Sequence, residues 1–168
     1  MSRAAEPSRA RGALAATLLL LGGLIFLSEA EAGTAPGSDQ IHPGRYSGGG
    51  FPSTPINFGV SANRAKVKNF TTRFKLDCKQ DGRLVGELIV RRLVFSVIPI
   101  QETARGGRFT RTSVVRFRQG GKLRVTVRGL LLAPERARGV LTAVARLPDG
   151  VICTPFFGPI RWTARYVG

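Results

Sequence analysis

Residue types that build catalytic and metal sites are scarce in this chain of 168 residues. The sequence has one histidine and two cysteines, and 10 Asp and Glu stand against 26 Lys and Arg. Metal centres and most nucleophilic or acid–base sites depend on His, Cys, Asp and Glu, and no Cys-x-x-Cys spacing or catalytic set is present. We therefore expect no enzyme activity, no metal site and no cofactor.

The few candidate catalytic groups have simpler explanations. His42 lies in a segment without any apolar period, which we expect to be flexible. The local group of acids is Asp77, Asp81 and Glu87, and Asp81 precedes Gly82 in a strong hairpin signal that accounts for it. The glycine-rich segments lie between predicted strands, without the following helix that a phosphate-binding loop needs.

Long apolar runs are also lacking, apart from one near the start at residues 13–27. Three arginines precede this run, and Ala30-Glu31-Ala32 supplies the small-x-small pattern of a signal-peptidase site. The run is shorter than the roughly 20 residues that span a bilayer. We predict that residues 1–32 are a cleavable signal peptide, with an uncleaved anchor as the alternative. The mature protein is then secreted or at the cell surface, with no transmembrane segment.

Positive charge dominates what remains. The formal charge of +16 stays on residues 33–168, because Arg3, Arg9 and Arg11 are offset by three glutamates in the leader. Such a field attracts polyanions, and the counterparts outside a cell would be anionic cell-envelope polymers, lipid head groups, acidic polysaccharide or nucleic acid. Arginine far outnumbers lysine, which the codon usage of a GC-rich genome also produces, so charge alone names no partner. The sequence does not determine an oligomeric state.

After the leader we expect a flexible tether, 33–43, and one domain, 44–168. The domain is a series of short alternating runs separated by turn residues, and connections this short require antiparallel pairing. We predict an all-β fold, an antiparallel β-sandwich of about eight to ten strands. A helix over residues 136–146 is the alternative to one strand. The expected strands cover 44–48, 55–60, 66–78, 83–98, 108–118, 122–132, 139–146, 151–153 and 160–167.

In two of these expected strands, the alternation of inward and outward residues shifts by one position. Val67 is out of phase with the inward set that follows it, which a β-bulge near Lys68-Asn69 or a separate segment explains. Within 83–98 the phase changes at Arg91-Arg92, either by an irregularity in one long strand or by a break between two, and Pro99 ends the run. Leu88 and Val90 lie on one phase of the alternation, and Leu93, Phe95 and Val97 lie on the other.

The two cysteines, Cys78 and Cys153, allow a single intramolecular bridge, and an even count in an exported chain favours one. Two buried thiols or a metal site are the alternatives. The alternation of its run places Cys78 on the inward face, where a bridge between two sheets would lie. Trp162 is the expected anchor of the core.

Several short motifs occur along the predicted domain: Gly44-x-Tyr46-x-Gly48, Ile56-x-Phe58-x-Val60, Lys66–Phe70, Cys78, Gly107-x-Phe109, Gly139-x-Leu141, Cys153 and Trp162. Taken together, these motifs resemble a group of small exported β-sandwich domains of uncharacterised function that is abundant in actinobacteria. The resemblance covers about residues 44–166 and implies an antiparallel sandwich with Cys78 paired to Cys153, but no chemistry. The chain departs from the group where Thr154–Pro159 forms a longer, apolar connection.

Two candidate binding features follow from the predicted strands. Outward arginines would form a guanidinium-lined surface for phosphate or carboxylate if their strands share a sheet; otherwise they are simply solvated. Phe156 and Phe157 either contact a partner or cap the core beside Trp162. The candidate arginines are Arg116, Arg118, Arg124, Arg128, Arg161 and Arg165.

These features predict a secreted or cell-surface, non-catalytic binding or structural module of unknown ligand. The first alternative is a polyanion-binding protein that uses the outward arginines. The second is a carrier of a small apolar ligand or lipid. Nucleic acid is not the expected polyanion, because no aromatic residues that could stack on bases alternate with these arginines.

Overall fold

The computed structural model describes residues 41–103, 106–132 and 135–168. The predicted signal peptide and most of the predicted tether lie outside these residues. Ile41, which the predicted tether includes, is only 1% exposed and belongs to the hydrophobic core.

The predicted antiparallel all-β fold is confirmed, with nine strands and no α-helix in the described residues. The segment 136–146 is a strand and not the alternative helix, and the β preference of its valines and threonine favours this outcome. None of the described residues forms a helix that is long and apolar enough to cross a membrane. The strands are β1 Gly44–Gly50, β2 Thr54–Val60, β3 Lys66–Gln80, β4 Arg83–Thr103, β5 Gly106–Arg116, β6 Lys122–Leu132, β7 Arg136–Arg146, β8 Ile152–Thr154 and β9 Ile160–Tyr166.

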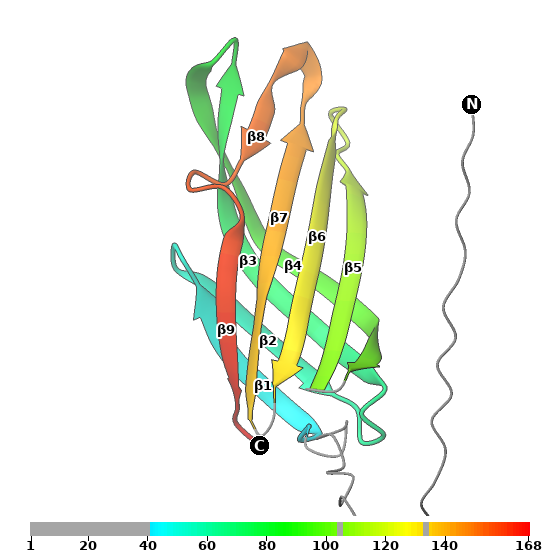
Figure 1. The fold of residues 1–168 in the computed structure, drawn as a ribbon. Coiled ribbons are helices and arrows are strands. Elements are labelled where there is room, and N and C mark those ends of the chain that lie inside the picture. Colours follow the sequence, from blue (N-terminus) through cyan, green and yellow to red (C-terminus); the bar gives the residue numbers. More distant parts are fainter. Residues whose placement is uncertain (1–40, 104–105, 133–134) are drawn as a thin grey trace, which may run out of the picture. The chain divides into compact units, whose positions relative to one another are not determined.

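All nine strands belong to one hydrogen-bonded sheet, with the order β2-β1-β9-β7-β6-β5-β4-β3-β8. Because β3 also pairs with β2, eight of the strands form a closed circuit, and β8 bridges β3 and β7. Figure 1 shows two layers that cross each other: β5, β6, β7 and β9 form the front layer, and β1 to β4 form the back layer. The two layers of the predicted sandwich are thus parts of a single continuous sheet.

The core lies between the layers and is rich in aromatic rings. Phe58 and Phe70 of the back layer contact Trp162 of β9, with ring centroids 6.1 and 5.7 Å apart. Trp162 is 2% exposed, as predicted for the core anchor. Small and aliphatic residues of β6 and β7 alternate inward with outward arginine and threonine, so the front layer buries one face and exposes the other.

Two bulges account for the two phase changes predicted in β3 and β4. Asn69 adopts a positive φ of 51°, and the β2–β3 register shifts beside it, so Val67 and the following set both face inward. In β4, Arg91 and Arg92 together stand opposite Arg73, which makes this one strand with a bulge. The inward phase then changes again after Phe95, so Ile98 is buried and Val97 is 44% exposed; the single phase predicted for Leu93, Phe95 and Val97 extends only to Phe95.

Pro99 does not end β4, contrary to the prediction, and the strand continues to Thr103. The N–H of Ile100 donates to the carbonyl of Ala65, which makes Lys66 and Pro99 a non-hydrogen-bonded pair. No ladder bond therefore needs an N–H at Pro99, and from Ile100 onward β4 pairs with β5 instead.

The predicted bridge between Cys78 and Cys153 is confirmed. It does not join two separate sheets, because Cys78 in β3 and Cys153 in β8 are register partners on neighbouring strands, with Cα atoms 3.9 Å apart. Cys153 also pairs with Ala145 of β7. The bridge therefore fastens the back layer, through the short strand β8, to the front layer.

Candidate anion-binding face

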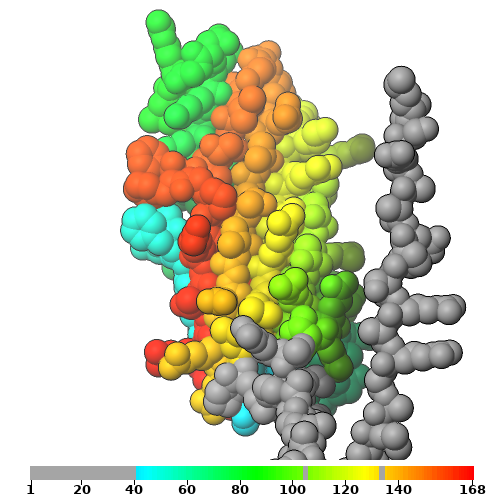
Figure 2. Space-filling model, viewed as in Figure 1, coloured from blue at the N-terminus to red at the C-terminus, as the bar shows by residue number. Residues whose placement is uncertain are grey.

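The outward face of the front layer is strongly cationic. Along β6, β7, β9 and the first residues of β5, buried residues alternate with outward ones, most of which are arginine, threonine or valine, and these four strands contain no Asp or Glu. We call this surface the cationic face; Figure 2 views the molecule from this side. Its exposed cations are Arg108, Arg116, Lys122, Arg124, Arg128, Arg136, Arg138, Arg146, Arg161 and Arg165.

The strand register arranges these side chains in rows across the sheet. One row runs Thr110, Arg128, Val140 and Arg161, and the next runs Arg108, Leu130, Arg138 and Thr163. Within a row, residues two strands apart are roughly 10 Å apart, and neighbouring rows on one face are separated by about 7 Å. Four guanidinium groups therefore surround one small area of the face.

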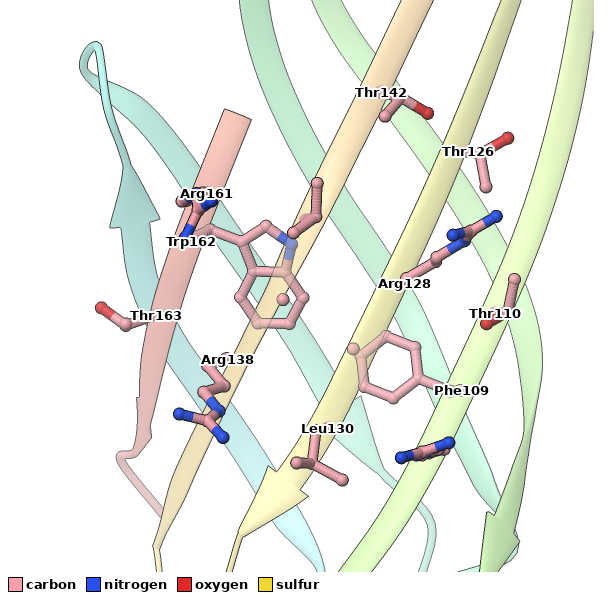
Figure 3. A pocket seen from close by; sticks show the side chains of 14 residues that line it. Phe109, Thr110, Thr126, Arg128, Leu130, Arg138, Thr142, Arg161, Trp162 and Thr163 are labelled. Carbon is pink, nitrogen blue, oxygen red and sulfur yellow. The ribbon is translucent and has the colours of Figure 1, made fainter. Parts of the chain in front are cut away.

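This area is a hollow of about 790 Å³, which we call the front hollow. Arg108, Arg128, Arg138 and Arg161 line it, together with threonines from all four strands. Figure 3 shows Arg128, Arg138 and Arg161 around the rings of Trp162 and Phe109. Guanidinium groups offer paired N–H donors and threonines offer hydroxyl groups, so the hollow suits phosphate, sulfate or carboxylate oxygens.

Repulsion within the face is not relieved by acids. Arg136 lies directly opposite Arg165, and Arg116 lies opposite Lys122, which in turn lies opposite Arg146. In the described part of the chain, no ion pair joins a cation of this face to a carboxylate. Like charges at opposed positions destabilise a sheet, and a bound polyanion would remove that cost.

Most of the predicted arginines lie on this face. Arg124 and Arg128 lie on β6 and Arg161 and Arg165 on β9, so the condition that their strands share a sheet is met. Arg116 is at the end of β5, whereas Arg118 lies beyond the strand, in the turn before β6.

Sequence reasoning missed the contribution of β7, which lies between β6 and β9. Arg136 and Arg138 precede the predicted start of that strand at Gly139, so the predicted outward arginines do not include them. The signal was available, because both arginines alternate with Ala137 and Gly139 in the same period as the rest of the strand.

Phe156 and Phe157 do not cap the core beside Trp162. They are 69% and 60% exposed and contact each other, with centroids 4.6 Å apart. Phe51, from the connection between β1 and β2, is 67% exposed and lies 5.0 Å from Phe157. The two connections lie side by side in Figure 2, in cyan and orange-red. Sequence reasoning missed Phe51, because only the fold brings it to the other two; we call the three rings the phenylalanine cluster.

The acids singled out from the sequence, Asp77, Asp81 and Glu87, lie in ordinary strand and turn positions. Asp77 and Glu87 are register partners, and Glu87 accepts a hydrogen bond from the Lys75 ammonium at 3.1 Å. Asp81 forms the β3–β4 turn with Gly82, as predicted. Among the described residues, no three His, Cys, Asp or Glu side chains gather as metal ligands would.

Comparison of the chain with protein-family models, curated proteins and solved structures finds no match. The resemblance to exported actinobacterial sandwich domains therefore stays a prediction, and the function has to be argued from the site itself.

Proposed function

We propose that this protein is an exported, non-catalytic module that binds an anionic polymer on its cationic face. The observation that carries the proposal is the segregation of charge: four adjacent strands expose arginine after arginine and no acid. A solvated surface under no constraint mixes both signs of charge, which avoids repulsion between opposed side chains.

The extent of the face favours a polymer over a single small anion. Opposed or neighbouring cations occur from the Arg116 end of β5 to Arg165 of β9. Each exposed contact contributes little in water, typically up to about 1 kcal/mol, so affinity requires many of them along one ligand. Threonine and valine, rather than exposed aromatic rings, lie between these cations, so the face offers no platform for stacked bases.

Export rests on two features that support each other. The predicted leader would direct the chain out of the cytoplasm, and the bridge between Cys78 and Cys153 is the kind of bond that persists in oxidising compartments. An anionic cell-envelope polymer or acidic polysaccharide is the partner chemistry that such a location supplies.

The test compares two quadruple variants that carry the same change in net charge. The first replaces Arg124, Arg128, Arg161 and Arg165 with Gln; the control replaces exposed Lys66, Lys68, Lys79 and Arg83, which lie away from the face, with Gln. Binding of labelled polygalacturonate and of long-chain polyphosphate is measured at 0.1 M salt.

We expect the first variant to lose at least about 10-fold in affinity and the control to lose much less, because four of the contacts proposed above are removed in one place. Equal losses in the two variants would show attraction by net charge alone and would overturn the proposal.

A further inference from the structure

A second surface, separate from the cationic face, lies beside the phenylalanine cluster. It is a hollow of about 820 Å³ between the start of β2, the middle of β3, the first half of β4 and the connection from β8 to β9. Phe156, Phe157, Leu84 and Ile89 line it with apolar side chains. Leu84 and Ile89 are themselves more than half exposed. We call it the apolar hollow.

The hollow exists because β3 changes partner here. β3 pairs with β2 up to Thr72 and with β8 from Asp77, so the edge between them, 73–76, has no partner strand. The connection that carries Phe156 and Phe157 passes this gap without pairing to it. Such a large group of exposed apolar side chains around one hollow is unusual on a protein that has no partner or ligand for it.

A smaller, cationic hollow of about 370 Å³ adjoins the apolar one. Arg73, Arg91 and Arg92 line it with polar residues of β2 and β3, and the two hollows share Arg73 and Arg91. The β4 bulge produces this arrangement, because it places both Arg91 and Arg92 opposite Arg73. We call it the arginine hollow; no acid lines it.

The acids of this region lie toward the other end. Asp77 and Glu87 are register partners and themselves line the apolar hollow at its end nearest the β3–β4 turn, where the Lys75 ammonium bonds Glu87. The three arginines at the bulge have no such carboxylate in register. A ligand in this region therefore contacts phenylalanine rings in the apolar hollow and, in the adjoining arginine hollow, guanidinium groups that have no carboxylate opposite them.

We propose that these joined hollows bind a single-chain anionic amphiphile, of the fatty-acid kind, one molecule at a time. Its hydrocarbon chain would lie against Phe156, Phe157 and Ile89, and its carboxylate would meet Arg73 and Arg91. The apolar hollow is of the size that small-molecule sites have, about 300–1,000 Å³. Guanidinium pairs are the groups best suited to hold a carboxylate.

This site shares no residue with the cationic face, so it does not depend on the polymer-binding proposal. The probe is 11-(dansylamino)undecanoate, whose emission rises in apolar surroundings, displaced by laurate in the full mature chain. Dodecanol and acetate are tested as competitors, because dodecanol has the hydrocarbon chain without the carboxylate and acetate has the carboxylate without the chain. We expect laurate to displace the probe at least 10-fold more strongly than dodecanol, and acetate to have no effect.

Two double variants locate the site. Phe156→Ser with Phe157→Ser should weaken probe binding at least 10-fold. Arg73→Gln with Arg91→Gln should weaken the binding of laurate at least 5-fold and leave the binding of dodecanol unchanged. The matched control, Arg124→Gln with Arg128→Gln on the cationic face, should change neither the binding of the probe nor that of laurate. All four side chains in the test variants are exposed, and retention of the Trp162 emission spectrum confirms folding.

Three results would each overturn the proposal. The first is unchanged probe affinity in the phenylalanine variant. The second is binding to vesicles of anionic phospholipid without binding to monomeric laurate, which would make the cluster a membrane contact. The third is a concentration-dependent dimer that the phenylalanine variant abolishes, which would make the surface an interface between two copies.

Discussion

Phe109 and Trp162 lie in contact across two intervening strands, with ring centroids 6.1 Å apart, because the residues between them are glycines. The register runs Phe109, Gly129, Gly139, Trp162, and four adjacent strands place the outer Cα atoms of such a row roughly 14 Å apart. Each ring covers its neighbouring glycine: a Cβ on Gly129 would overlap the Phe109 ring, and one on Gly139 would overlap the Trp162 ring. Figure 3 shows the two rings extending toward each other.

Gly129→Ala tests this packing directly. The new methyl group overlaps the Phe109 ring in a fully packed core, so we expect the free energy of unfolding to fall by about 1–3 kcal/mol in urea denaturation. Adding Phe109→Leu removes the far end of the ring and should recover part of the loss, so that the double variant is more stable than the sum of the single effects. Strictly additive effects would show that the two residues do not compete for one space.

The bridge between Cys78 and Cys153 closes a loop of 75 residues in sequence separation. Replacing both cysteines with alanine should lower the free energy of unfolding by about 2–5 kcal/mol, because the unfolded chain regains the freedom that the bridge removes. The measurement is guanidinium unfolding of the variant beside the oxidised and the reduced wild type. Reduced wild type should resemble the variant; a variant as stable as the oxidised protein would contradict this role.

Tyr46 predicts a loss of stability in alkali. Burial, reinforced by the neighbouring Tyr166 and Glu135, raises the pKa of Tyr46 to about 12; its hydroxyl donates to the His42 carbonyl at 3.0 Å. The unfolded chain releases this proton near pH 10, so between pH 10 and 12 it binds fewer protons than the folded protein, and stability falls as the pH rises.

The expected loss attributable to Tyr46 is about 3 kcal/mol over that window, with no change below pH 10. Tyr46→Phe keeps the ring and removes the titrating group, so the difference between wild type and variant isolates this effect from that of lysine deprotonation. Unfolding curves at pH 8 to 12 provide the measurement. Parallel curves for both proteins would contradict the assignment.

Alternation along single strands was enough to predict the all-β fold, the inward position of Trp162 and the phase changes at Asn69 and Arg91-Arg92. Each of these depends on neighbours in sequence. The predicted end of β4 at Pro99 failed because the cost of proline depends on which side of the strand is paired, and that is a property of the neighbouring strand.

Predicting the candidate sites required the order of the strands in the sheet, which the alternation along single strands does not reveal. The arginines of β6 and β9 could be singled out, but not the fact that β7 lies between them and adds Arg136 and Arg138. In the same way, Phe156 and Phe157 were visible as an apolar pair, whereas Phe51, roughly a hundred positions earlier, joins them only through the fold.

Like charges face each other on the cationic face, so we expect added salt to weaken their repulsion and not to lower the free energy of unfolding. Arg136 and Arg165 stand directly opposite each other, a placement that costs roughly 0.2–1 kcal/mol. Arg165→Gln should therefore raise the free energy of unfolding by a few tenths of a kcal/mol at 10 mM salt. The gain should disappear at 0.5 M salt, where screening already weakens the repulsion. A loss of stability at low salt would mean that Arg165 has a structural partner.

Asn69 tests whether the bulge in β3 is what holds Val67 and Phe70 on the same face. Its φ of 51° lies in the left-handed region, which asparagine tolerates and β-branched residues avoid. Asn69→Val should cost about 1–3 kcal/mol in urea denaturation, because the side chain is strained whatever its exposure, whereas Asn69→Gly should cost little or nothing. If valine were tolerated as well as glycine, the strand would have straightened and carried Val67 to the outward face, where a cysteine introduced at position 67 would react with thiol reagents.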